Sequence, residues 1–315
     1  MILRRFDSFS APTVKAGPAI WAIAFVAVSS SLYAEEPAAL QNTSPSSTEE
    51  QAAANEASPF SGNFGLRLRS STTNRTDYDY RIFINPSLSL NYEFKDLLTL
   101  GFYASGTKDL NNEQRSSLND LNVSVSRSFQ LLGADSLVVK PKTEVEPLKE
   151  AGLSLDLQAY YGAPVSRDLY KYSNSKGTLG FSPGLGYSFG GGLTGLNVNV
   201  GLTYERYLYQ YEYANGGQIL TKYSVSQSYG LSYTLGSWTL AGDFTNVSSW
   251  DFDDSKENDS FLAVETLRYK IDKLWSLQAG HINNGNTFDY LGESNNVTFY
   301  DKRRSQVFVG TSYNF

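Results

Sequence analysis

The chain has 315 residues, a formal net charge of −6 and only 18% charged residues, and it contains one His and no Cys. Zinc sites built from Cys, thiol nucleophiles and disulfides are therefore excluded, a multi-His metal centre has too few ligands, and no cofactor is expected. The acidic balance also excludes the basic surface that nucleic acid would require. The mean hydropathy of −0.33 argues against a bundle of membrane-spanning helices. It leaves a membrane β-barrel open, because a barrel strand exposes only alternate residues to lipid.

The first 34 residues have the features of a secretory signal peptide. Basic residues precede an apolar run over residues 18–28, which is too short for a helix that spans a bilayer, and small residues lead to Ala34. We expect cleavage after Ala34, with a membrane anchor as the alternative. Residues 35–59 carry five Glu, no Lys or Arg and no aromatic residue, so they are predicted to form a disordered acidic tether in the periplasm.

From Phe60 onward, apolar and polar residues alternate with the period of a β-strand. Between Leu196 and Glu205, for example, Leu, Val and Tyr interleave with Asn, Gly, Thr and Glu. A soluble β-sandwich and a membrane barrel both produce this pattern, since each has one apolar and one polar face. Long strands, aromatic residues near strand ends, and connections that alternate between short and long favour the barrel.

The last nine residues, 307–315, alternate in the same way and end in Phe. They resemble the C-terminal signal strand of porin-like outer-membrane β-barrel proteins of Gram-negative bacteria, with Gly310, Tyr313 and Phe315 at its fixed offsets. Phe308 departs from the polar residue that is usual at the first position of that signal. The resemblance implies insertion by the barrel-assembly machinery into the cell outer membrane, among outer-membrane lipid and lipopolysaccharide. It does not name a function.

The alternation predicts an all-β fold, a transmembrane antiparallel β-barrel over residues 60–315. An even number of strands leaves both termini on the periplasmic side. Residues 132–150 are interpreted as a long periplasmic connection, because Pro141 and Pro147 disfavour a membrane-embedded strand. If this stretch were a strand, the barrel would need 14 strands. The predicted strands, 12 in number, span 62–70, 78–94, 97–106, 117–131, 151–163, 176–189, 194–213, 218–235, 237–250, 258–272, 274–284 and 303–315.

One face of these strands would line the lumen. Over 176–189 that face carries only small residues from Thr178 to Ser188, which favours a wetted lumen over a packed one. We predict a basic and an acidic wall facing one another across the pore, with mutual salt bridges as the alternative. Glu265 interrupts the apolar outer pattern, and a bulge near Thr266 is predicted to turn it into the lumen. The basic wall comprises Arg67, Arg69, Arg81, Arg268 and Lys270, and the acidic wall comprises Asp156, Glu205 and Asp243.

A lipid hydrolase of the outer membrane is the enzymatic alternative. Its attacking group is missing, because Asn283 occupies the position two residues after His281 where a nucleophilic Ser would be needed. We therefore expect no catalytic residue, no metal site and no enzyme activity. The favoured function is a passive channel for small polar or charged solutes. The rival from another class is a structural or surface-anchoring barrel with a plugged lumen, and the oligomeric state is left open.

Overall fold

A computed structural model of the chain is one antiparallel β-barrel. It describes residues 58–72, 81–94, 98–111, 116–132, 151–165, 173–288, 295–298, 300–301 and 304–315. The predicted signal peptide, most of the predicted tether and the predicted connection after Leu132 lie outside these residues. Within the described part, no helix has the length and apolar character needed to cross a membrane.

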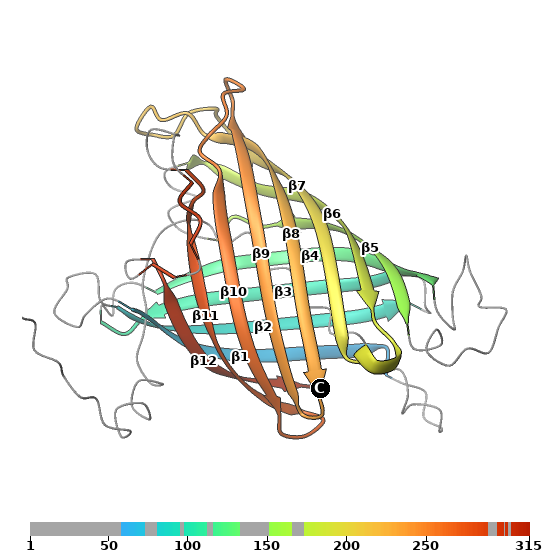
Figure 1. The fold of residues 1–315 in the computed structure, drawn as a ribbon. Coiled ribbons are helices and arrows are strands. Elements are labelled where there is room, and N and C mark those ends of the chain that lie inside the picture. Colours follow the sequence, from blue (N-terminus) through green and yellow to red (C-terminus); the bar gives the residue numbers. More distant parts are fainter. Residues whose placement is uncertain are drawn as a thin grey trace, which may run out of the picture.

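The strands of the described chain, 12 in all, pair with their neighbours in sequence, and β1 closes against β12 (Figure 1). The predicted all-β barrel of 12 strands is thereby confirmed. Because β4 pairs directly with β5, no further strand separates them. The strands are β1 (Phe60–Ser71), β2 (Ile82–Phe94), β3 (Leu98–Asp109), β4 (Ser116–Leu132), β5 (Gly152–Gly162), β6 (Ser175–Ser188), β7 (Leu196–Tyr209), β8 (Thr221–Leu235), β9 (Trp238–Asp251), β10 (Ser260–Lys270), β11 (Trp275–Asn286) and β12 (Gln306–Asn314).

Most strand ends fall within a few residues of the prediction, but β7 is shorter than expected. The alternation continues to Tyr213, whereas β7 ends at Tyr209. Tyr213 instead forms an isolated bridge with Ile219, inside the connection to β8. An alternating aromatic pattern therefore overestimates a strand that runs into a Tyr-rich loop.

The two ends of the barrel differ in their connections. Phe60 and Phe315 lie at one end, which we call the turn end, and the opposite end is called the loop end. At the turn end, β8 and β9 are joined by Gly236 and Ser237 alone, and Gly236 adopts a φ of 57°. Glycine tolerates this left-handed conformation, which two-residue hairpins require. A short 3-10 helix, η2 (Gly191–Leu193), connects β6 and β7 at the same end.

The two faces of the wall are clearly distinct. Large apolar side chains such as Leu202, Leu231 and Leu240 are exposed, so they lie on the outer face. The alternate residues on β8, including Ser224 and Ser228, are buried on the lumen face. Because directly paired residues on neighbouring strands share a face, the registers of all pairs extend this assignment around the barrel.

Aromatic rings gather on the outer face at the turn end. Pairs of rings form within and between strands, with centroid separations of 4.6 Å for Trp238–Tyr269 and 4.9 Å for Trp275–Tyr313. Tyr313 also lies 6.1 Å from Phe315. Rings with an apolar body and a polar tip suit the boundary between lipid and water. We call this set, which also includes Tyr233, the turn-end girdle.

The predicted bulge near Thr266 is wrong. The ladders of β10 with β9 and with β11 run without a register shift, so Glu265 shares the outer face with Leu267 and Tyr269. Its direct partner is His281, whose Nδ1 lies 3.6 Å from a Glu265 carboxylate oxygen. A polar neighbour on the adjacent strand lowers the cost of an outward carboxylate, so no bulge is needed.

Candidate channel lining

A row of lumen-facing residues crosses the strands at the closing seam of the barrel. Arg67 on β1 pairs with Gly310 on β12, which pairs with Gln278 on β11, which in turn pairs with Arg268 on β10. Two arginines predicted for the basic wall are thus brought onto one face, with Gln278 and Gly310 between them. The seam also joins segments far apart in the sequence.

Gly310 opens the space that this row needs. A Cβ atom at this position would lie 3.0 Å from Arg67 Cγ and 3.2 Å from Gln278 Nε2, so both side chains lean over the glycine. It would also lie 2.6 Å from the backbone oxygen of Leu66, so any side chain would force β12 away from β1. The glycine predicted as part of the assembly signal therefore has a local packing role.

Phe308 lies on the lumen face of the same seam, and its side chain is only 3% exposed. The Arg67 guanidinium lies 5.3 Å from the centroid of the Phe308 ring, within cation–π range. The ring occupies the space over Gly280 on β11, where a Cβ would approach it to 2.4 Å. The buried Phe308 ring therefore packs on the lumen face and orients the Arg67 side chain.

The residues of the predicted basic wall follow the seam from one end of the barrel to the other. Lys270 is the last residue of β10 at the turn end, and Arg268 lies two residues before it. Arg67 and Arg69 are the eighth and tenth residues of β1, which runs toward the loop end. Arg81 directly precedes β2 at the loop end, where Ile82 pairs with Ser70. We call these five residues the basic track.

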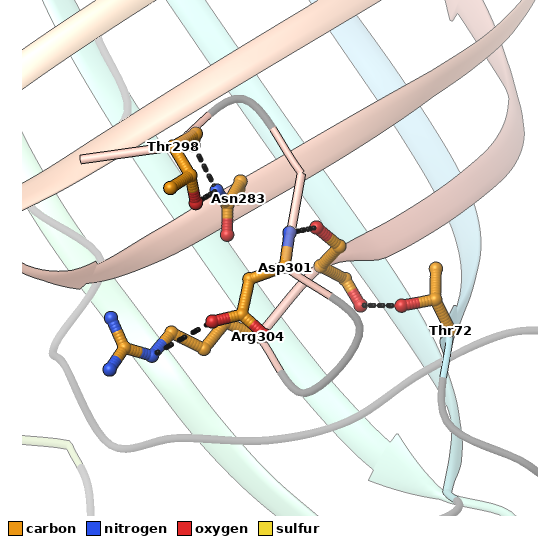
Figure 2. A network of polar contacts seen from close by, with 6 residues as sticks. Thr72, Asn283, Thr298, Asp301 and Arg304 are labelled. Carbon is orange, nitrogen blue, oxygen red and sulfur yellow. Dashed lines mark hydrogen bonds and ion pairs between the residues drawn. The ribbon is translucent and has the colours of Figure 1, made fainter. Parts of the chain in front are cut away.

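The loop end of the seam is tied together by a polar network (Figure 2). Thr72, after β1, donates from its Oγ1 to the Ser305 carbonyl at 3.2 Å, and the Ser305 hydroxyl accepts the Asp301 backbone N–H at 2.9 Å. Arg304 Nε lies 3.6 Å from the Asp301 carboxylate. These contacts join the β11–β12 connection to β1, and so support the strand that carries Arg67 and Arg69.

Glu205 is a buried carboxylate on the lumen face of β7, 7% exposed, and neutral donors satisfy it. Tyr160 of β5 and Tyr207 both donate hydroxyl hydrogen bonds to it, the latter at 3.1 Å, as does Ser224 of β8 at 3.1 Å. Tyr160 reaches across β6 because Gly180 lies beneath its ring, where a Cβ would meet Tyr160 Cζ at 2.1 Å.

The other two carboxylates of the predicted acidic wall also lie on the lumen face. Asp156 of β5 accepts hydrogen bonds from the hydroxyls of Ser128 and Ser154. Asp243 of β9 lies within electrostatic range of Arg268 on the neighbouring strand. Among the described residues, Asp156 and Glu205 are held by hydroxyl groups and form no ion pair with a Lys or Arg.

The wall between the acidic residues is built from small side chains. Gly180, Ser182 and Gly184 follow one another on the lumen face of β6, directly opposite Tyr160, Gln158 and Asp156 on β5. The hydroxyls of Ser182 and Thr203 are 2.8 Å apart. These positions agree with the predicted lumen face of 176–189.

His281 lies on the outer face, directly opposite Glu265. Its ring stacks on Tyr300 with a centroid separation of 6.0 Å, and its Nδ1 faces Glu265. Asn283, two residues further along β11, is fully buried. Its amide donates a hydrogen bond to the backbone oxygen of Thr298 (Figure 2). An amide at this position supplies no nucleophile for acyl transfer.

Three lumen residues, Phe308, Gln278 and Tyr160, were missed in the sequence. Each acts across strands, through a glycine on a neighbour, and depends on registers that a single strand pattern does not specify. An aromatic residue at an inward position, opposite a glycine in the same row, is the signal that could have found Phe308 and Tyr160.

No model of a known protein family matches the chain, and no curated protein matches it. Several solved structures are similar to it. An outer membrane channel from Pseudomonas putida F1 aligns with a TM-score of 0.50 and 12% identity, over 83% of this chain and 97% of that chain. The NanC porin aligns with a TM-score of 0.47 and 11% identity, over 80% and 98% of the two chains. An anion-selective porin from Comamonas acidovorans aligns with a TM-score of 0.34 and 12% identity, over 81% and 98%.

At identities this low, the comparison gives information about the fold alone. The inference rests on the Pseudomonas channel, which aligns with a TM-score of 0.50. The chain therefore has a β-barrel fold of the kind found in outer-membrane channels, in agreement with the resemblance of its last strand.

Proposed function

We propose that the protein is a passive channel of the outer membrane for small polar or charged solutes. The observation that supports this proposal is the basic track: Lys270, Arg268, Arg67 and Arg69 share the lumen face between the turn end and the upper part of β1, and Arg81 directly precedes β2 at the loop end. A charged solute that follows the seam meets a cation at each stage of its passage, and a low-dielectric wall strengthens such a field.

The opposite wall supports the same function. Asp156 and Glu205 lie on β5 and β7, away from the seam, and their hydroxyl partners hold them in place without neutralising their charge. A basic track facing fixed carboxylates places a transverse field across the lumen, which orients a dipolar solute and selects among ions.

The rival function is a structural or surface-anchoring barrel whose lumen is closed. In that case the buried charges would serve stability alone. Lipid hydrolysis has less support, because Asn283 provides no attacking group beside His281.

Planar-bilayer recording of the refolded full-length chain tests the proposal. An open channel gives discrete and reproducible single-channel steps, with a conductance that scales with salt concentration. Suppose gel migration shows that the protein is folded and heat-modifiable, yet the bilayer recording shows no steps. This result would contradict the channel and favour the structural barrel.

A further inference from the structure

The outer wall is apolar on most strands, but it changes character on β8–β11. On β5–β7 the outward residues of the strand interiors are Leu, Val, Phe, Tyr, Ala and Pro, and the one outward charge, Arg206, lies toward the loop end of β7 against the Phe252 ring. On β8–β11, by contrast, Gln227, Asn246, Glu265 and His281 face outward, together with Gly242. We call these five residues the polar outer patch.

Glu265 lies deep in the zone that lipid would cover. It is four residues from Tyr269 of the turn-end girdle, which corresponds to roughly 10 Å along the membrane normal for a tilted strand. The apolar band of such barrels is about 25 Å tall. The Glu265 side chain is 54% exposed, although His281 lies beside it. A half-exposed carboxylate at this depth requires a polar cover that lipid tails do not provide.

Four residues of the polar outer patch form two pairs that lie at matching heights on either side of the boundary between β9 and β10. Gly242 lies four residues after Trp238 on β9, and Glu265 lies four residues before Tyr269 on β10. Gln227 lies six residues before Tyr233 on β8, and His281 six residues after Trp275 on β11. Residues at equal distances from the turn-end girdle therefore flank the boundary between β9 and β10 on both sides.

We propose that the outer wall of β8–β11 binds a second copy of this chain, related by a two-fold axis along the membrane normal between β9 and β10. Two copies in one membrane share their orientation, so each residue meets a residue at its own height. Glu265 of one copy then lies opposite Gly242 of the other. A Cβ at Gly242 has no atom within 4 Å, so the glycine leaves open space for the incoming carboxylate.

The same axis places Gln227 of one copy opposite the Glu265–His281 pair of the other. Its carboxamide can donate a hydrogen bond to the carboxylate, which satisfies the group that lipid would leave bare. Within each copy the Glu265 carboxylate also has a polar neighbour of its own, because the His281 imidazole lies 3.6 Å away.

Cross-linking tests this arrangement, and the chain is suited to it because it contains no Cys. Leu240→Cys introduces a thiol on the outer face of β9, at a side chain that is 61% exposed. The full-length variant, inserted in vesicles at low protein density, is treated with a bis-maleimide spanning about 10 Å, the spacing of packed sheets. Leu100→Cys on β3, on the far side of the barrel, is the matched control.

We expect covalent dimers from Leu240→Cys at about tenfold the yield of Leu100→Cys. Adding Gly242→Leu should fill the open site and reduce that yield at least severalfold. Adding Ala159→Leu, on the outer face of β5, should leave it unchanged. Heat-modifiable migration checks that each variant is folded.

Equal and low yields from the two Cys variants would show that lipid covers the patch, and would overturn the proposal. If adding Gly242→Leu does not change the dimer yield, the proposed position of the two-fold axis is overturned. Channel conductance is measured separately, so failure of the dimer leaves the proposed function intact.

Discussion

The Arg67 guanidinium lies over the Phe308 ring across the closing seam of the barrel, with the guanidinium carbon 5.3 Å from the ring centroid. The first residue belongs to β1 and the second to β12, so this contact forms only when the barrel closes. It positions a cation on the lumen wall midway along the basic track. Stability of the seam and orientation of the track are thereby linked.

Replacing Phe308 should weaken the seam. Phe308→Leu removes the cation–π contact and part of the packing over Gly280, and should destabilise the barrel by about 1–3 kcal/mol. The measurement is the midpoint of thermal unfolding in detergent, followed by gel migration of unboiled samples. Phe64→Leu, at an exposed outer position of β1, is the control and should shift the midpoint less. Equal shifts would contradict a special role for Phe308.

Gly180→Ala should disrupt the Tyr160–Glu205 contact. The added methyl group would lie 2.1 Å from the Tyr160 ring, so the ring must leave its place over β6. We expect a loss of about 1–3 kcal/mol in stability, as in other overpacked sites. Gly184→Ala, on the same face of the same strand, is the matched control because its nearest contact would be an ordinary 3.7 Å. Comparable unfolding midpoints for the two variants would refute this packing.

Gly310→Ala should impair closure of the barrel. Its methyl group would approach the Leu66 carbonyl oxygen to 2.6 Å, and backbone cannot yield as a side chain can. The expected result is a clearly smaller folded fraction after refolding into detergent, at a cost of about 1–3 kcal/mol. Ser312→Ala, two residues along the same face, loses only its 2.7 Å contact with Ser276 and should refold nearly as well. Normal refolding of Gly310→Ala would show that β12 tolerates the displacement.

The architecture was predictable because period-two alternation is a local property of each strand. The alternation from Leu196 to Glu205 predicts which side chains of β7 face outward and which face the lumen. The registers of β7 with β6 and with β8 agree with that assignment. Two-residue connections such as Gly236-Ser237 can also be recognised from the local sequence, and they indicate the end of the barrel at which the short turns lie.

Contacts between strands were less predictable, because they depend on register. Glu265 and His281 are 16 residues apart, and only the β10–β11 ladder places them side by side. Without that pairing, an outward carboxylate looked costly enough to require a bulge. Phe308 likewise stood out only as an unusual residue in the last strand, since its space is provided by Gly280 on β11.

Ion selectivity is the most direct consequence of a basic track facing fixed carboxylates. Arg81→Gln combined with Arg268→Gln removes positive charge from the loop end and from near the turn end, and should increase the relative permeability to cations by about twofold or more. Asp156→Asn combined with Asp243→Asn should change it by a similar factor toward anions. The Oδ1 of Asn can still accept the hydrogen bond from the Ser128 hydroxyl, and its amide nitrogen can donate to the Ser154 hydroxyl, so the polar contacts at this position are kept.

The reversal potential in a salt gradient across a planar bilayer tests the channel most directly. Our account predicts steady single-channel currents for the unmodified chain, and shifts of opposite sign for the two double variants. Reversal potentials that are the same for all three proteins, together with lower unfolding midpoints for both variants, would contradict it, because the charges would then act only as internal salt bridges.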